Sequence, residues 1–204
     1  MKRIVVVFVM TLMAVSAFAD TGTILVFGDS ISAGFGLSPP ERSWVNLLQS
    51  KLHSEGYGYR VINASVSGET TAGGLARLPR ALSLHHPAIV VLELGGNDGL
   101  RALPVAAMRA NLAQMALLAR AGGAEVLLLG MRIPPNYGPA YTEQFFSAFG
   151  LVALELHLRC VPFLLQDVAL SAGLMQADGF HPNELGQPRL LDNVWPALKP
   201  MLRK

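Results

Sequence analysis

The sequence contains little cysteine and little charge. Only one of its 204 residues is a cysteine, Cys160, so no disulfide bond can form within the chain. We expect Cys160 to be a small buried apolar residue rather than a reactive thiol. Charged residues make up 15% of the chain, the net charge is +2, and no basic run stands out. These features argue against a nucleic-acid partner.

Motifs for metal binding are also lacking. Four of the five histidines either precede a proline at the end of a helical stretch or lie inside a helical pattern. None of the four forms a metal-ligand motif with a Cys or Glu. We interpret these four, His53, His85, His86 and His157, as surface or structural residues. The sequence therefore predicts neither a metal site nor a bound cofactor.

A long apolar run occurs only at the N-terminus, where it predicts a targeting segment. The positive residues 2–3 precede an apolar stretch at 4–15, and Ala-Phe-Ala at 17–19 matches a cleavage site. The pattern predicts a signal peptide over residues 1–19, cleaved before Asp20, and hence a periplasmic or secreted protein. The alternative is an uncleaved anchor, although the apolar stretch is short for a membrane span.

The remaining residues, 20–204, are expected to form one domain, because 51% hydrophobic residues can supply a large core. Apolar runs rich in β-type residues alternate with helical patterns. The expected strands are residues 23–28, 59–64, 88–94, 125–131 and 161–165. The expected helices are residues 41–55, 71–84, 104–120, 139–159 and 186–199. Pro79 is expected to kink or interrupt its helix. This order predicts a three-layer α/β/α sandwich with a five-stranded, doubly wound parallel sheet of the flavodoxin-like kind.

A polar turn, Gly28-Asp29-Ser30, ends the first expected strand. In a doubly wound sheet, ligands bind at the carboxyl ends of the strands, so Ser30 is a candidate nucleophile. A serine hydroxyl is a weak nucleophile that needs a base beside it. Taken alone, the turn is explained equally well if Ser30 or Asp29 caps the next helix.

A second polar segment, at 178–182, can supply that base. Asp178 and His181 are three residues apart and can meet within one turn, and Pro182 disfavours helical backbone at His181. The carboxylate can accept the Nδ1 proton of His181 and leave Nε2 free for Ser30. By themselves the two residues are also compatible with a structural histidine or a metal site.

Acyl transfer also requires hydrogen-bond donors for the developing oxyanion. Gly68 follows the second expected strand and permits close backbone approach, and the side chain of Asn97 follows the third strand and can donate. Each has a simpler explanation, a turn glycine for Gly68 and a loop cap for Asn97. Their common position at strand ends favours a site.

These segments resemble the SGNH hydrolases, also called GDSL-type esterases. The four sequence blocks of that family occur here in order: GDS at 28–30, Gly68 within SVSGET, GGND at 95–98, and DGFH at 178–181. The similarity continues through residues 63–79 and 91–104, so it spans nearly the whole chain after residue 20. The chain is most similar to the bacterial periplasmic thioesterase, lysophospholipase and arylesterase group.

The resemblance implies a role for each block. Ser30 is then the nucleophile, His181 the general base, and Asp178 the residue that orients it. The oxyanion hole is formed by the backbone amides of Ser30 and Gly68 and the side chain of Asn97. In relatives of the thioesterase type, the loop that matches residues 132–138 moves over the acyl chain. The resemblance therefore makes Ile133 and Pro134 substrate-binding residues, in a loop stiffened here by an additional Pro135.

We therefore expect an exported serine hydrolase that cleaves esters and thioesters of small acyl substrates, including lysophospholipids, without a cofactor. The mature chain is expected to be a monomer that does not insert stably in a membrane. One alternative is a deacetylase of cell-wall or polysaccharide acetyl esters, which the same fold can host. Another is an exported binding protein without activity, against which the complete set of Ser30, Asp178 and His181 counts.

Overall fold

The structure, a computed structural model, describes residues 22–204, and its centre is a parallel β-sheet. The strands are β1 Gly22–Gly28, β2 Tyr59–Asn63, β3 Ile89–Glu93, β4 Glu125–Leu129 and β5 Arg159–Val161. β1, β3 and β4 are apolar along almost their whole length because helices cover both faces of the sheet. The predicted signal peptide at residues 1–19 lies outside the described residues.

The strand order is β2-β1-β3-β4-β5 and every neighbouring pair is parallel. The chain therefore winds outward from β1 in one direction and from β3 in the other, which makes the β1–β3 boundary the topological switch point. Gly28 at the end of β1 lies opposite Glu93 at the end of β3. Ligands of doubly wound sheets bind at this switch point. The strand order and the parallel pairing confirm the predicted five-stranded, doubly wound fold.

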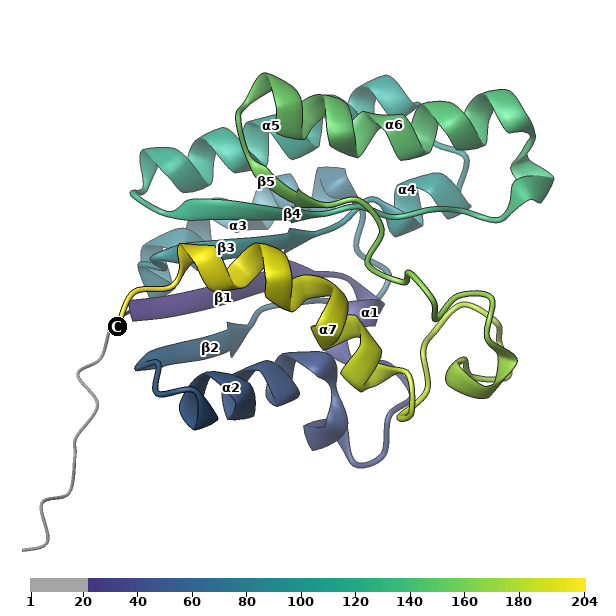
Figure 1. Ribbon diagram of the computed structural model, residues 1–204. Coiled ribbons are helices and arrows are strands. Elements are labelled where there is room, and N and C mark those ends of the chain that lie inside the picture. Colours follow the sequence, from purple (N-terminus) through teal and green to yellow (C-terminus); the bar gives the residue numbers. More distant parts are fainter. Residues whose placement is uncertain (1–21) are drawn as a thin grey trace, which may run out of the picture.

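Two helical layers enclose the sheet (Figure 1). The helices are α1 Ser30–Ala33, α2 Trp44–Ser54, α3 Thr71–His85, α4 Gly96–Leu100, α5 Val105–Ala121, α6 Pro139–Glu155 and α7 Gln187–Leu198. Short 3₁₀ turns occur at Pro40–Arg42, Pro135–Tyr137, Ala172–Leu174 and Lys199–Met201. Helices α2 and α7 pack together on one face, and α3, α5 and α6 pack side by side on the other. The short helices α1 and α4 lie at the carboxyl ends of β1 and β3.

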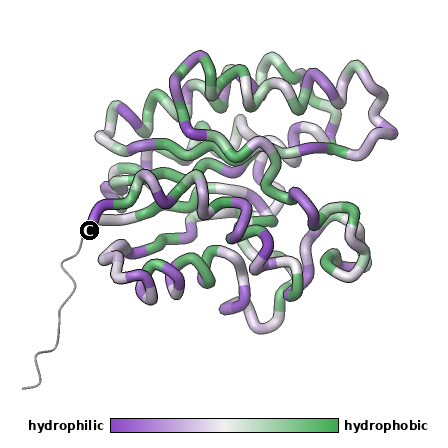
Figure 2. The backbone as a smooth tube through the Cα atoms, viewed as in Figure 1, coloured by the Kyte–Doolittle hydropathy of each residue, from purple (hydrophilic) through white to green (hydrophobic). Residues whose placement is uncertain are grey.

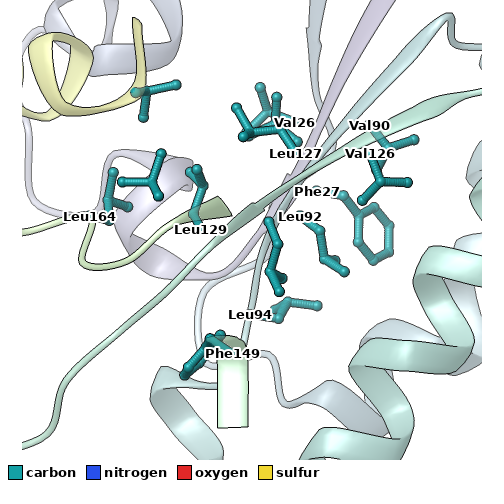
Figure 3. Packing of buried hydrophobic residues seen from close by; sticks show 14 of the residues in the cluster. Val26, Phe27, Val90, Leu92, Leu94, Val126, Leu127, Leu129, Phe149 and Leu164 are labelled. Atoms are coloured by element: carbon teal, nitrogen blue, oxygen red, sulfur yellow. The ribbon is translucent and has the colours of Figure 1, made fainter. Parts of the chain in front are cut away.

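The core consists of side chains that alternate between the two faces of the sheet. Figure 3 shows Val26 and Leu127 on one side of the strands and Phe27 and Leu92 on the other. Apolar residues accordingly line the centre of the molecule, and hydrophilic residues gather on the outer sides of the helices (Figure 2). Within residues 22–204, no helix combines the length and the apolar character needed to cross a bilayer.

Two expectations about element boundaries were wrong. β5 is Arg159–Val161 rather than 161–165, because Pro162 has no N–H to continue the ladder and the chain bends there around Gly130. Of the two outcomes expected at Pro79, a kink or an interruption, the interruption does not occur, because α3 continues through Pro79 to His85.

The helix expected at 139–159 ends at Glu155. Two residues later the chain turns through His157, whose φ of 52° is incompatible with a continuing helix. This turn returns the chain to the sheet as β5. The remaining helices and strands lie close to their predicted positions, and α4 is an additional short helix.

Candidate active site

The residue after β1, Asp29, fixes the position of Ser30. Its carboxylate oxygen Oδ1 accepts the N–H of Ile31 at 3.0 Å and caps α1, so Ser30 is the first helical residue. The preceding Gly28 has no room for a side chain, because a Cβ there would lie 2.5 Å from Oε2 of Glu93. Because Asp29 makes the capping hydrogen bond, the Ser30 hydroxyl is not needed as a helix cap and can bond to another group.

The Ser30 hydroxyl meets His181, which comes from the far end of the chain. His181 Nε2 lies 2.8 Å from Ser30 Oγ, and His181 Nδ1 lies 2.7 Å from Asp178 Oδ2. The other oxygen of Asp178, Oδ1, accepts the backbone N–H groups of Phe180 and His181 at 2.9 and 3.0 Å. A carboxylate at Nδ1 favours the tautomer with the proton on Nδ1. His181 Nε2 is then free to accept the hydroxyl proton.

Hydrogen bonds from its neighbours stabilise the charge of the Asp178 carboxylate. Burial would raise the pKa of this carboxyl, but hydrogen bonds from the His181 ring and from two backbone amides hold it at about 2. Asp178 therefore stays ionised through the pH range in which an esterase works. The ring of Phe35 packs against the ring of His181, with the two ring centres 4.7 Å apart.

Asn97 lies in the first turn of α4, directly beyond β3. Its side-chain nitrogen Nδ2 donates to Asp29 Oδ2 at 3.0 Å. Gly68 lies in the turn after β2 with a φ of 79°, which a glycine adopts without strain. The Arg101 side chain donates to the Gly68 carbonyl oxygen at 2.9 Å. Ser30, Gly68 and Asn97 all line one pocket, so the fold brings these three predicted residues together.

That pocket has a volume of about 530 Å³ and a predominantly apolar wall. Ile133 and Pro134, predicted to contact the substrate, belong to the wall. The other apolar side chains of the wall are Ile31, Phe35, Leu100, Met131, Pro135, Phe163, Leu165, Ala169, Leu170, Met175 and Phe180. Several of them come from the segment between β5 and α7, which extends along the carboxyl ends of the strands (Figure 1). The volume and lining suit an apolar chain.

Sequence reasoning missed several parts of this site. It treated Asp29 only as a helix cap and overlooked Phe35. It assigned residues 161–165 to a strand, whereas Phe163 and Leu165 line the pocket. The apolar character of that stretch was the available signal, but a short apolar run does not show whether its side chains enter the core or a pocket.

Two further residues have structural contacts. Asp98 is buried and accepts the Thr71 backbone N–H at 2.8 Å and the Thr71 hydroxyl at 2.5 Å, which ties α4 to the start of α3. Half-buried Cys160 lies on β5, where burial raises the pKa of its thiol to about 11. No group of three or more His, Cys, Asp or Glu side chains among residues 22–204 is arranged to hold a metal ion.

A serine hydroxyl hydrogen-bonded to a histidine, at the switch point of a doubly wound sheet and beside an apolar pocket, is the arrangement of an α/β serine hydrolase. Residues 26–189 match the GDSL-like Lipase/Acylhydrolase family, and the chain belongs to that family. It is an enzyme that acts on ester bonds.

Two curated relatives cover most of the chain. Esterase TesA of Pseudomonas aeruginosa is 58% identical over 184 residues, which are 90% of this chain and 91% of that protein. Thioesterase 1/protease 1/lysophospholipase L1 of Escherichia coli is 40% identical over 184 residues, which are 90% of this chain and 86% of the relative.

Solved structures of related proteins have the same fold. A crystal structure of TesA, 58% identical, superposes with a TM-score of 0.86 over 88% of this chain and 99% of its own. The psychrotrophic esterase EstA from Pseudoalteromonas sp., in a structure inhibited by monoethylphosphonate, is 41% identical. It superposes with a TM-score of 0.83 over 87% of this chain and 97% of its own.

Proposed function

We propose that this protein is an exported serine hydrolase that cleaves carboxylic esters and thioesters of acyl chains through a Ser30-His181-Asp178 triad. The observation that carries this proposal is the 2.8 Å contact between Ser30 Oγ and His181 Nε2 beside an apolar pocket of about 530 Å³. Hydrolysis at such a site requires no metal or cofactor, because the chain supplies the nucleophile, the base and the hydrogen-bond donors.

Acylation begins when Ser30 Oγ attacks the substrate carbonyl carbon. His181 Nε2 takes the hydroxyl proton, and Asp178 stabilises the imidazolium that forms. The carbonyl oxygen becomes an oxyanion, which in this proposal accepts hydrogen bonds from the backbone amides of Ser30 and Gly68 and from the side chain of Asn97. His181 then gives its proton to the leaving alcohol or thiol, and the acyl-enzyme remains.

Deacylation repeats these steps with water as the nucleophile. His181 takes a proton from water, the resulting hydroxide attacks the acyl carbonyl, and the same three donors bind the second oxyanion. The carboxylic acid then leaves as Ser30 regains its proton from His181.

The apolar wall indicates the substrate class. An acyl chain lying against Ile133, Pro134 and their neighbours loses water contact along its length, which favours medium or long chains over acetyl groups. Two relatives are named an arylesterase and a thioesterase 1/protease 1/lysophospholipase L1, so esters, thioesters and lysophospholipids are the candidate substrates. We expect the mature enzyme to act on them as a monomer.

A graded panel of substrates tests the proposal. p-Nitrophenyl esters, acyl-CoAs and lysophospholipids of increasing chain length should all be hydrolysed, with kcat/KM rising from acetyl to medium chains. A fluorophosphonate probe should label the wild-type protein and fail to label Ser30→Ala. Activity confined to acetylated sugars would favour a polysaccharide deacetylase instead, and equal labelling of Ser30→Ala would remove Ser30 as the nucleophile.

Export rests on the pattern of residues 1–19, and it has its own test. The mature protein should begin at Asp20 and be recovered from the periplasm or the medium. N-terminal sequencing that begins before residue 17 would instead indicate a retained anchor.

A further inference from the structure

Two buried carboxyl groups, those of Asp29 and Glu93, lie next to the turn that carries Ser30 and have no part in the triad mechanism. Asp29 is 2% exposed and Glu93 is fully buried. Glu93 Oε2 accepts the Ser32 hydroxyl at 2.7 Å and the backbone N–H of Asp29 at 3.3 Å. Burying two carboxyl groups side by side is costly, so their presence beside the nucleophile calls for a reason.

The contacts of Asp29 point to Asn97. One oxygen of the Asp29 carboxylate is held by the Ile31 N–H in the helix cap. The other oxygen, Oδ2, accepts from Asn97 Nδ2 at 3.0 Å. The two oxygens therefore connect the helix that carries the nucleophile to the side chain proposed to bind the oxyanion.

The chemistry of this contact determines which way the Asn97 amide faces. An amide has a donating end and an accepting end of nearly the same shape, and it can turn over at little steric cost. An ionised carboxylate only accepts, so it selects the orientation in which Nδ2 faces Asp29. The nitrogen carries two hydrogens, and the second is left for the pocket that Asn97 lines. The opposite orientation would present the lone pairs of the Asn97 oxygen to an oxyanion.

We propose that Asp29 is a positioning residue that keeps the donating end of the Asn97 amide directed at the oxyanion, with Glu93 holding Asp29 in place. This inference rests on the proposed role of Asn97 in the oxyanion hole. Asp29 contacts no substrate in this scheme and acts only through Asn97.

The ionisation of Asp29 is consistent with this role. Burial raises the pKa of Asp29 to about 6, while the Ile31 N–H, the Asn97 amide and the charge of His181 lower it and nearby Asp98 raises it. Burial, followed by the charge of Asp29, raises the pKa of Glu93 well above its ordinary value. Near neutral pH Asp29, the residue that faces Asn97, is therefore ionised, while burial and the charge of Asp29 both favour the protonated form of Glu93.

The test is a double-mutant cycle on Asp29 and Asn97. Asp29→Asn keeps the oxygen that caps Ile31 but places an amide nitrogen opposite Asn97. Asn97 must then turn its oxygen toward residue 29 and loses its donor to the pocket. Asp29→Asn should lower kcat by about 10²–10³-fold with little change in KM, as the loss of an oxyanion donor does. Asn97→Ala should have a similar effect, and the double variant should be no slower than Asn97→Ala alone.

Each failure has a separate meaning. Near-wild-type kcat in Asp29→Asn, or multiplying losses in the double variant, would overturn the positioning role while leaving the oxyanion role of Asn97 intact. Near-wild-type kcat in folded Asn97→Ala would overturn the oxyanion role itself, and this inference with it.

Ser32→Ala provides the matched control. Ser32 is fully buried in the same cluster and donates to Glu93, whereas the Asn97 side chain donates to Asp29. This variant should lose thermal stability and keep kcat within about threefold of wild type. A kcat loss in Ser32→Ala as large as in Asp29→Asn would show that any disturbance of the cluster slows the enzyme, and would overturn the specific role of Asp29. Circular dichroism of all variants confirms that each comparison is made on folded protein.

Discussion

At the scale of single residues, Ser30 and His181 should behave as one unit. Ser30→Ala and His181→Ala should each lower kcat by about 10⁴-fold or more, and the double variant should be scarcely slower than either, because neither group is useful without the other. Steady-state kinetics on a p-nitrophenyl ester measure this directly. Multiplying losses, or a single variant with substantial activity, would contradict the triad.

Asp178 should act through the tautomer of His181. Asp178→Asn keeps the shape of the side chain but presents a nitrogen that can donate to Nδ1. The proton then favours Nε2, which no longer accepts from Ser30, and kcat should fall by up to about 10⁴-fold. Asp167→Asn, an exposed residue on the same segment, is a suitable control and should leave kcat unchanged. Equal kinetics of the two variants would exclude an orienting role for Asp178.

At the scale of secondary-structure elements, the stretch between β4 and α6 should select for acyl chain length. Ile133 lines the pocket and packs closely on α4, where a Cβ on Gly99 would lie 2.6 Å from its Cγ2 atom. Ile133→Ala should lower kcat/KM more for long chains than for acetyl esters, since each methylene that loses apolar contact contributes about 0.8 kcal/mol.

A chain-length series of p-nitrophenyl esters gives the comparison, with Leu117→Ala on the exposed side of α5 as the control variant. A loss in Ile133→Ala that is the same for every chain length would indicate that the residue supports the fold but does not contact the acyl chain.

The elements also show what the sequence could and could not predict. β1, β3 and β4 were predictable because strands covered on both faces must be apolar throughout. Polar residues that directly follow such strands then lie at the carboxyl ends of the sheet. Ser30 after β1 and Asn97 after β3 could therefore be expected together, whereas His181 follows no strand directly and was expected there from its DGFH sequence block. The wall formed by residues 163–180 could not, because an irregular segment has no periodicity to reveal which side chains face inward.

The Asp29–Asn97 contact was not predictable either. Asp29 is sufficiently explained as a helix cap, and its second oxygen finds Asn97 only through the alignment of β1 with β3. Contacts between residues that are distant in sequence depend on the sheet register, which a single sequence does not display.

At the scale of the whole molecule, buried Glu93 should make stability depend on pH. Burial and the charge of Asp29 raise its pKa in the folded state well above the 4.5 of the unfolded chain. The folded protein therefore binds a proton that the unfolded chain releases. The free energy of unfolding should then fall as pH rises above about 4.5, by up to about 1.4 kcal/mol per pH unit, until Glu93 ionises in the folded state.

Glu93→Gln removes this dependence because glutamine cannot ionise, while its oxygen can still accept from Ser32 and Asp29. The variant should match wild type near pH 4 and become progressively more stable than wild type toward pH 8 in urea unfolding. Exposed Glu143→Gln serves as the control, with no such divergence. Parallel stability curves for Glu93→Gln and wild type would show that Glu93 does not retain its proton.

The partners of the 2.8 Å contact in the active site are 151 residues apart in the chain. Ser30 belongs to the first strand-to-helix turn, whereas the segment carrying His181 is held late in the fold, where Gln187 Oε1 accepts the Trp44 N–H at 2.9 Å. During biosynthesis Ser30 leaves the ribosome long before His181, its proposed base, has been added to the chain. If the proposed triad is correct, a chain that lacks its C-terminal part cannot hydrolyse esters, and the appearance of esterase activity reports that the segment carrying His181 has folded into place.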